Sequence, residues 1–315
     1  MNDLSFREGR ASDLETVYEL GERAWDLSRA ARGTIAETDV RTDQELRDRW
    51  AHERPLLEFM TSGLDGACFL VCEDAGRLVG YVIVAHFPGM DEMAQLWLEP
   101  THRGQGVGRS LLERCWPNSP SRELGRLVIA VGRPADLTLF TEFGVMPVTG
   151  HWHMRHRVDR YLEQRAQEVD ATEPGVHVLT PERAVEEWKR LEPDAIGHER
   201  AALHEFFGRT RNCLATVDAS GSATALCWVS GQGEIGPGVG ANAEDLVPVV
   251  LAALDRVAKM QEPESFGVHC TTASWWLMDR LRRLGFRVHW PAWIMSSVPL
   301  PGLDRYLPTR PVRLL

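Results

Sequence analysis

The sequence predicts an α/β protein of mixed α+β character, with two tandem domains that each contain a mixed, mostly antiparallel sheet flanked by helices. Three observations support this prediction. The chain has 315 residues, which is long for one compact domain and sufficient for two cores. A strand, a glycine-rich loop and a helix follow one another between residues 93 and 115. A fainter version of the same pattern returns after residue 175.

The first domain is predicted over residues 1–158, and the periodicity of its apolar residues indicates the order of its elements. These are a strand at 4–8, polar helical segments up to residue 62, strands at 67–73 and 78–86 joined by an Asp-Ala-Gly turn, a strand at 93–98, a helix from 107, a strand at 127–131, and a helix at 135–143 that ends at Gly144.

Residues 159–175, a charged stretch with Pro and Gly, are predicted to be a linker to a second domain at 176–315. That domain repeats the first in outline, with strands at 176–179, 213–217 and 223–230 and helices at 181–191 and 243–260. Short sequence similarities support an internal duplication. They relate Gly238-Val239-Gly240 to Gly106-Val107-Gly108, Leu284-Gly285-Phe286 to Phe143-Gly144-Val145, and Asp304–Leu307 to Asp159–Leu162.

Composition restricts the partners of the chain. A net charge of −10 argues against nucleic acid or an anionic membrane, because both select basic surfaces. No apolar segment is long enough to span a bilayer, and the N-terminus lacks the apolar core of a secretory signal. Six cysteines without a CxxC motif predict buried thiols in a reducing cytoplasm. Only Lys189 and Lys259 are lysines, an arginine bias typical of a GC-rich bacterial genome.

The strongest functional signal lies between the strand at 93–98 and the following helix. Glycines at 104, 106 and 108 allow the backbone to turn tightly and direct its N–H groups toward one point. The positive end of the helix dipole lies at the same place, so the loop is suited to bind a phosphate. A glycine-rich turn without a ligand is the alternative interpretation. A P-loop fits less well, because Arg109-Ser110 stands where Gly-Lys-Ser/Thr is required, and the dinucleotide fingerprint is absent.

At these residues the chain resembles the GNAT superfamily of CoA-dependent N-acetyltransferases, whose pyrophosphate loop Arg103, Gly106 and Gly108 match. The tandem, two-domain type of this family would account for nearly the whole chain. The resemblance implies acetyl-CoA as cofactor. It also implies that the pantetheine arm binds the strand residues Leu96, Trp97 and Leu98, and that the pyrophosphate binds Arg103, Gly104, Gln105, Gly106, Val107, Gly108, Arg109 and Ser110.

The catalytic residues are not indicated by the same resemblance. The family's proton-donating Tyr corresponds to Phe140, which cannot donate, and an Asn corresponds to Arg133. Glu92 and Glu99 are candidate bases, although surface carboxylates at the two ends of a strand are the more common case.

The second domain is expected to bind CoA weakly. Glu244 and Asp245 stand in its first helical turn, where they oppose an incoming anion, and Leu281 replaces the Tyr.

Several other residues are interpreted as structural. His151, His153 and His156 lie close together on a strand, but no further ligands cluster nearby in the sequence, so no metal site is predicted. Cys270 beside His269 is expected to be a buried core thiol. The tryptophans of the second domain are expected to fill its core rather than an acceptor pocket; they are Trp275, Trp276, Trp290 and Trp293.

The sequence therefore predicts an acyl-CoA-dependent N-acyltransferase that acts on a small-molecule amine, compatible with bacterial secondary metabolism, with one tightly held acetyl-CoA per chain. The alternative is an acetyl-CoA-binding protein in which the cofactor is structural or sensory and no transfer occurs. No residue pattern in the expected acceptor segments, 29–62 and 192–211, indicates the acceptor. The oligomeric state is equally open.

Overall fold

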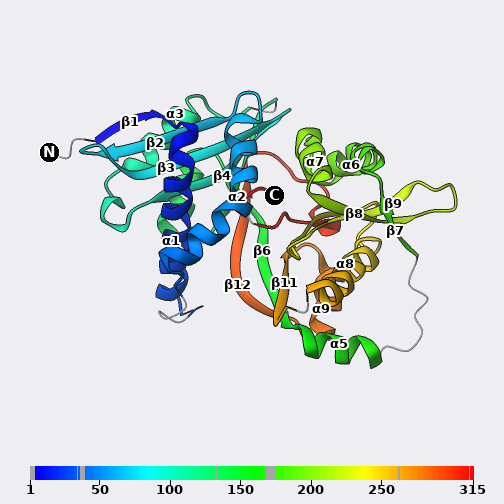
Figure 1. Cartoon of the computed structure of the whole chain (residues 1–315). Coiled ribbons are helices and arrows are strands. Elements are labelled where there is room, and N and C mark those ends of the chain that lie inside the picture. The colour runs from blue at the N-terminus through cyan, green and yellow to red at the C-terminus, as the bar shows by residue number, and fades with distance from the viewer. Residues whose placement is uncertain are drawn as a thin grey trace. The chain divides into compact units, whose positions relative to one another are not determined.

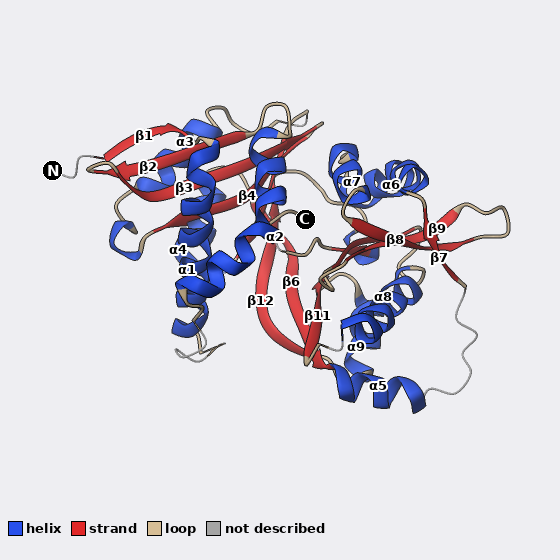
Figure 2. Ribbon diagram, viewed as in Figure 1, coloured by secondary structure: helices blue, strands red, loops and turns tan. Residues whose placement is uncertain are grey.

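The computed structural model describes residues 4–33, 35, 40–121, 123–131, 133–167, 175–261, 263–311 and 313–315. Its chain forms two compact units, shown by position along the chain in Figure 1 and by secondary structure in Figure 2. The first unit holds Met1–Val128 and Leu139–Gly144, and the second holds Ile129–Thr138 and Val145–Leu315. None of the helices in the described part combines the length and the apolar character that a bilayer span requires.

The first unit is a five-stranded sheet in the order β1-β2-β3-β4-β5, antiparallel except for the parallel pair β4 and β5. Two helices, α1 and α2, lie over one face of the sheet, as Figure 1 shows, and α3 packs on the other face. The elements are β1 (Leu4–Glu8), α1 (Leu14–Ala31), α2 (Asp43–Ser62), β2 (Cys68–Asp74), β3 (Arg77–Phe87), β4 (Met90–Leu98), α3 (Val107–Cys115), β5 (Gly125–Ala130) and α4 (Pro134–Glu142), the last two shared between the units.

The second unit contains two groups of paired strands, β12-β6-β11 and β13-β10-β9-β8-β7. Its core lies where α8 and α9 pack against β8, β9 and β11. The elements are β6 (Met146–Arg157), α5 (Val158–Gln167), β7 (Val176–Leu179), α6 (Pro181–Ile196), α7 (Ala201–Gly208), β8 (Arg211–Val217), β9 (Ala223–Ser230), β10 (Ile235–Gly240), α8 (Leu246–Gln261), β11 (Ser265–Thr271), α9 (Trp275–Arg283), β12 (Arg287–Ser296) and β13 (Tyr306–Leu307).

The order of elements repeats, which supports the predicted duplication. The series from β1 to β6 is strand, two helices, three strands, helix, strand, helix, strand, and the series from β7 to β12 is the same once α5 is set aside. Gly144 and Gly285 end the equivalent helices α4 and α9 with positive φ. Two other sequence similarities are not structural equivalences. Gly238–Gly240 ends strand β10, whereas Gly106–Gly108 begins helix α3, and Asp159–Leu162 is helical whereas Asp304–Leu307 leads into β13.

The compact units divide the chain differently from the predicted boundary at residue 158. Strand β6 pairs with β11 on one side and β12 on the other, so the last strand of the first repeat belongs to the second unit. The predicted linker at 159–175 begins inside helix α5, and its residues 168–174 lie outside the described residues. A long-range strand pairing of this kind leaves no local mark in the sequence.

The expectation of six buried thiols is wrong for one pair. Cys68 at the start of β2 and Cys115 at the end of α3 form a disulfide, and the other four cysteines are free and buried.

The expectation that the tryptophans of the second domain fill its core is also wrong for three of them. Trp290 is buried, but Trp275, Trp276 and Trp293 are exposed by 72%, 54% and 44%.

Candidate active site

The loop that joins β4 to α3 leaves its backbone accessible. Gly104 and Gly106 have φ of +73° and +82°, a conformation that glycine adopts at no steric cost. No atom lies within 4 Å of where a Cβ would stand at either position. Gly108 is buried, and its Cα faces Leu96 and Leu98 at ordinary contact distance, so it sets how closely α3 packs on β4. The loop is therefore an open turn on a tightly packed base.

The N-terminus of α3 points its amides into this open turn. The first hydrogen bond of the helix runs from the Ser110 N–H to the Gly106 carbonyl oxygen at 2.9 Å. The N–H groups of residues 107–109 precede it and have no acceptor within the helix. Together with the helix dipole, they form the electropositive end that a phosphate requires.

The side chains of the loop are held close to the backbone around it. Arg103 donates from Nε to the Leu98 carbonyl oxygen at 3.1 Å, and Gln105 donates to the Thr101 carbonyl oxygen at 2.7 Å. Arg109 forms an ion pair with Glu142 of α4. Val107 is buried beneath the turn. The eight predicted loop residues thus lie together, although their contact with a ligand stays a prediction.

Strand β4 separates from β5 just before this loop. The parallel pairing covers only Met90–Met93 of β4, whereas β4 continues along β3 up to Leu98. The register with β3 shifts between Met93 and Gln95, which marks a bulge at the point of separation. The edge of residues 94–98 therefore extends beyond its partner strand toward the loop. Leu96, Trp97 and Leu98, the predicted pantetheine contacts, lie on this edge.

The two faces of β4 serve different sides of the site. Leu96 and Leu98 contact the face that carries α3. Trp97 pairs with Tyr81 of β3 and lies on the other face beneath α1, where its ring meets Trp25 edge to face. The Tyr81 hydroxyl and the Gln95 amide oxygen are 3.3 Å apart there, and only a glycine at position 21 of α1 leaves room for that hydroxyl. The α1 face is thus the side on which an acceptor can approach the edge.

The two carboxylates predicted as candidate bases differ in their surroundings. Glu92 pairs with Ala85, which places it on the α1 face, and its side chain is buried. Glu99 follows the strand, and its carboxylate accepts from Arg77 at 2.8 Å and lies 3.9 Å from His102. A carboxylate held by an arginine is stabilised in its charged form and is a poor proton acceptor. The geometry favours Glu92.

Sequence reasoning missed a group of residues on helices α1 and α2. The Tyr18 hydroxyl is buried without a hydrogen-bond partner among the described residues. Burial, and then the charges of Glu22 and Glu53, raise the pKa of Tyr18 to about 12, so the phenol keeps its proton. Glu53 is itself buried. The four-residue spacing of Tyr18 and Glu22 was the available signal, because it places both on one helix face.

The family's catalytic positions have changed surroundings as well as changed residues. Phe140 is buried in α4 with no polar atom to offer. Arg133 forms an ion pair with Asp136 at 2.7 Å, and its carbonyl oxygen accepts the first hydrogen bond of α4, from Leu137. Both side chains are therefore engaged in packing or capping α4.

The histidines of β6 are joined by two others that the sequence pattern did not indicate. His269 of β11 stacks between His151 and His153, at centroid distances of 4.9 Å and 4.5 Å, and His289 meets His153 edge to face. His156 points to the opposite sheet face and packs on Phe286. Stacked rings direct their in-plane lone pairs along parallel planes, so the three do not converge on one ion.

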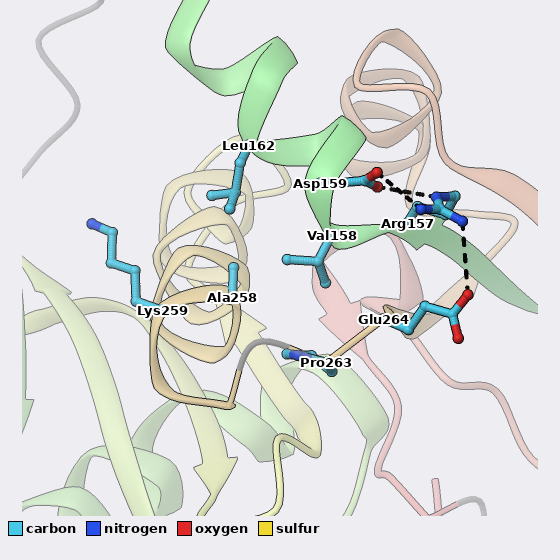
Figure 3. A pocket seen from close by; sticks show the side chains of 8 residues that line it. All are labelled: Arg157, Val158, Asp159, Leu162, Ala258, Lys259, Pro263 and Glu264. Atoms are coloured by element: carbon cyan, nitrogen blue, oxygen red, sulfur yellow. Dashed lines mark hydrogen bonds and ion pairs between the residues drawn. The ribbon is translucent and has the colours of Figure 1, made fainter.

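Two further features of the second unit offer no catalytic group. Cys270 is fully buried in its core, and burial raises the pKa of its thiol, as expected for a structural cysteine. A pocket of about 530 Å³ opens between α5 and α8 (Figure 3). Its Arg157 pairs with Asp159 and Glu264, so its charges largely satisfy one another. The lining residues are Arg157, Val158, Asp159, Leu162, Ala258, Lys259, Pro263 and Glu264.

Comparisons with known proteins agree with this geometry. Residues 65–144, which contain β4, the loop and α3, match the family model of the acetyltransferase (GNAT) domain. No curated protein matches the chain in sequence.

Solved structures with the same fold extend over the whole chain. A Pyrococcus horikoshii protein described as an acetyltransferase matches with a TM-score of 0.71 and 12% identity, over 100% of this chain and 97% of that one. A tandem GNAT protein from the clavulanic acid biosynthesis pathway matches with 0.60 and 18%, over 94% and 99%. A GCN5-related N-acetyltransferase from Sphaerobacter thermophilus matches with 0.51 and 18%, over 94% and 96%. Residues 65–144 therefore form an acetyltransferase domain of the GNAT family, whose cofactor is acetyl-CoA, and the chain is a GNAT-type N-acetyltransferase with the tandem fold.

Proposed function

We propose that the first unit binds acetyl-CoA and transfers its acyl group to a small-molecule amine. The observation that carries this proposal is the open glycine turn at the N-terminus of α3, next to the edge of β4 that extends beyond β5. The turn offers amides to a pyrophosphate, and the edge offers backbone groups to an extended amide-containing arm. Bound acetyl-CoA would supply the activated thioester.

The residues of the α1 face would prepare the acceptor. Glu92 is placed to accept the proton that an ammonium group must lose before it can attack. Trp97 and Trp25 provide an aromatic surface that suits the body of an organic amine. The Tyr18 hydroxyl, which keeps its proton, can donate a hydrogen bond to the acceptor. These groups orient an amine and exclude water from the reacting edge.

A small acceptor also agrees with the charge of the chain. A net charge of −10 disfavours nucleic acid and attracts cationic amines. The arginine bias is typical of a GC-rich bacterial genome, and a tandem GNAT protein of the clavulanic acid pathway shares the fold. On these two associations we propose a role in bacterial secondary metabolism.

One observation favours a second candidate function, an acetyl-CoA-binding protein without transfer. Phe140 replaces the expected proton donor and is fully packed. A leaving thiolate would then have to take its proton from another group or from water.

A single assay separates the two functions. Free CoA thiol is measured after wild-type protein is mixed with acetyl-CoA and a panel of primary amines. Transfer predicts thiol release that depends on the amine and saturates with it, together with an acetylated product of the expected mass. Tight acetyl-CoA binding without amine-dependent release from any member of the panel would favour the binding protein.

A further inference from the structure

A short segment near the end of the chain covers the edge of β10 in the second unit. Strand β13 pairs antiparallel with β10, joining Leu307 to Gly238 and Tyr306 to Val239. The other edge of β10 is taken by β9. We call residues 303–310 the strap. It supplies the strand pairing for an edge that would otherwise be open on that side.

The edge covered by the strap corresponds to the proposed pantetheine edge of the first unit. The repeated order of elements makes β10 and β11 the counterparts of β4 and β5. In the first unit residues 94–98 extend beyond β5. In the second unit the strap occupies this place and reaches β11 as well. Thr271 donates to the Leu303 carbonyl oxygen at 2.5 Å, and Arg310 donates to the Gly267 carbonyl oxygen at 2.6 Å.

The loop after β10 is closed where its counterpart is open. The Asp245 carboxylate accepts from both the backbone N–H and the side-chain amide of Asn242, at 3.0 Å each. A Cβ at Gly240 would stand 2.5 Å from the Asn242 carbonyl oxygen, whereas none at Gly104 or Gly106 would meet an atom within 4 Å. Arg305 of the strap donates to the Ala241 carbonyl oxygen at 3.2 Å. The strap and the loop thus close on each other.

A buried polar network anchors the strap to α6 and α7. Glu192 accepts from Arg200 at 2.7 Å, from the Tyr306 hydroxyl at 3.0 Å and from His204 at 2.7 Å. These four side chains are at most 1% exposed. Removing one partner would leave a buried charge unpaired, which is costly, so the network holds the strap firmly. Thr309 adds a hydrogen bond to the Leu315 carbonyl oxygen at 2.6 Å.

From this geometry we infer that the strap is a permanent occupant of the second cofactor groove, so that the chain closes its own second acetyl-CoA site. The inference rests on the proposed function of the first unit. It assigns the second unit a role other than cofactor binding, with its sheet edge satisfied by backbone of the same chain. Release of the strap would require both the strand pairing and the buried network to break.

Native mass spectrometry of wild-type protein and Gly106→Val with saturating acetyl-CoA counts the occupied sites. One ligand per wild-type chain and none in Gly106→Val is the expected result. A second ligand in wild type, or one retained by Gly106→Val with affinity within tenfold of wild type, would overturn the inference.

Hydrogen exchange with and without acetyl-CoA then locates the ligand. Protection confined to residues 94–110, with unchanged slow exchange at 238–240 and 306–307, supports both proposals. Protection at 94–110 together with any change at 238–246 or 303–310 would contradict the strap alone. Protection at 238–246 only would contradict both.

The variant Thr309→Val tests the anchoring without touching the first unit. Loss of one buried hydrogen bond should speed exchange of the 306–307 amides by roughly fivefold while acetyl-CoA affinity stays within twofold. Thr210→Val, at an exposed threonine, is the matched control and should change neither. Unchanged exchange in Thr309→Val, or a loss of acetyl-CoA affinity, would contradict the proposed independence of strap and cofactor.

Discussion

Two carboxylates near the ends of β4 show how local contacts decide which residue can accept a proton. Glu92 is buried on the α1 face, whereas Glu99 is held by Arg77. We expect Glu92→Gln to lower the rate of amine-dependent CoA release by about 100-fold, because an amide cannot take the proton. Acetyl-CoA affinity should stay within twofold. The measurement is steady-state thiol release beside calorimetric binding.

The matched control for this prediction is Glu99→Gln, which removes a carboxylate of the same strand. Its transfer rate should remain within threefold of wild type, because only the ion pair with the exposed Arg77 is lost. A larger loss of rate in Glu99→Gln than in Glu92→Gln would exchange their roles.

Phe140 gives a second prediction for a single residue. Its side chain is buried and lacks a proton donor. Phe140→Tyr restores the phenol of the family pattern, so we expect amine-dependent release to rise by about tenfold if proton delivery limits turnover. Stopped assays with the same amine panel measure this. If release is no faster with any amine, the missing phenol does not limit the reaction.

Helix α3 is secured at both ends by contacts that differ in kind. Its N-terminus begins at the glycine turn, and its last residue, Cys115, is bonded to Cys68 of β2. A cross-link over 47 residues restricts the unfolded chain, so reduction should lower the free energy of unfolding by about 3–4 kcal/mol. Urea denaturation with and without reductant tests this, and Cys115→Ser should reproduce the reduced protein. Identical transitions in both conditions would show that the disulfide does not form in solution.

The elements that the sequence predicts well are those defined by neighbouring residues. The glycine turn, the β2–β3 hairpin and helix α4 ending at Gly144 all follow from local turn and periodicity rules. Strand β13 was not predicted, because two residues following a one-turn helix carry no periodic pattern. The placement of β6 in the second unit was missed for a different reason, since pairing with strands more than 100 residues away leaves no local signal.

The same limit applies to the candidate site. The eight loop residues could be identified because the phosphate-binding pattern is contiguous in the chain. Tyr18 and Glu53 could not, because their approach to one another depends on how α1 and α2 pack over the sheet. The stacking of His269 between His151 and His153 likewise depends on the register of β11 against β6.

At the scale of the whole molecule, this histidine stack predicts how stability depends on pH. Burial is the main cause that lowers the pKa of His151 to about 3 and of His153 to about 2, and it also lowers that of His269. Below about pH 6.5 the unfolded chain binds protons that the folded chain refuses. The free energy of unfolding should therefore fall as pH drops from about 6.5 toward 3, by up to about 1.4 kcal/mol per pH unit for each imidazole.

Urea denaturation between pH 7.5 and 5 tests this dependence. His151→Phe should flatten the slope, because one imidazole that resists protonation is gone. His177→Phe, at an exposed histidine of β7, is the matched control and should keep the slope of wild type. Equal slopes in both variants would show that the stack does not govern the acid sensitivity of the fold.

The two units apply the same order of elements to different ends. The first keeps an open turn and a strand edge that extends beyond its partner, and the second fills both places with its own backbone. The central claim is therefore that acetyl-CoA binds at the turn around Gly106. Gly76, in the β2–β3 turn, offers a matched comparison, since its φ of +80° and empty surroundings resemble those of Gly106.

Calorimetric titration of acetyl-CoA into Gly106→Val and Gly76→Val tests this claim most directly. Both variants place a branched side chain at positive φ and should lose a similar 1–2 kcal/mol of stability, about the cost of that conformation. We predict that Gly106→Val weakens acetyl-CoA binding at least about 100-fold, because the side chain obstructs the approach of a phosphate to the α3 amides. Gly76→Val should bind as wild type does. Undiminished affinity in Gly106→Val, or an equal loss in both variants, would contradict the assignment of the site.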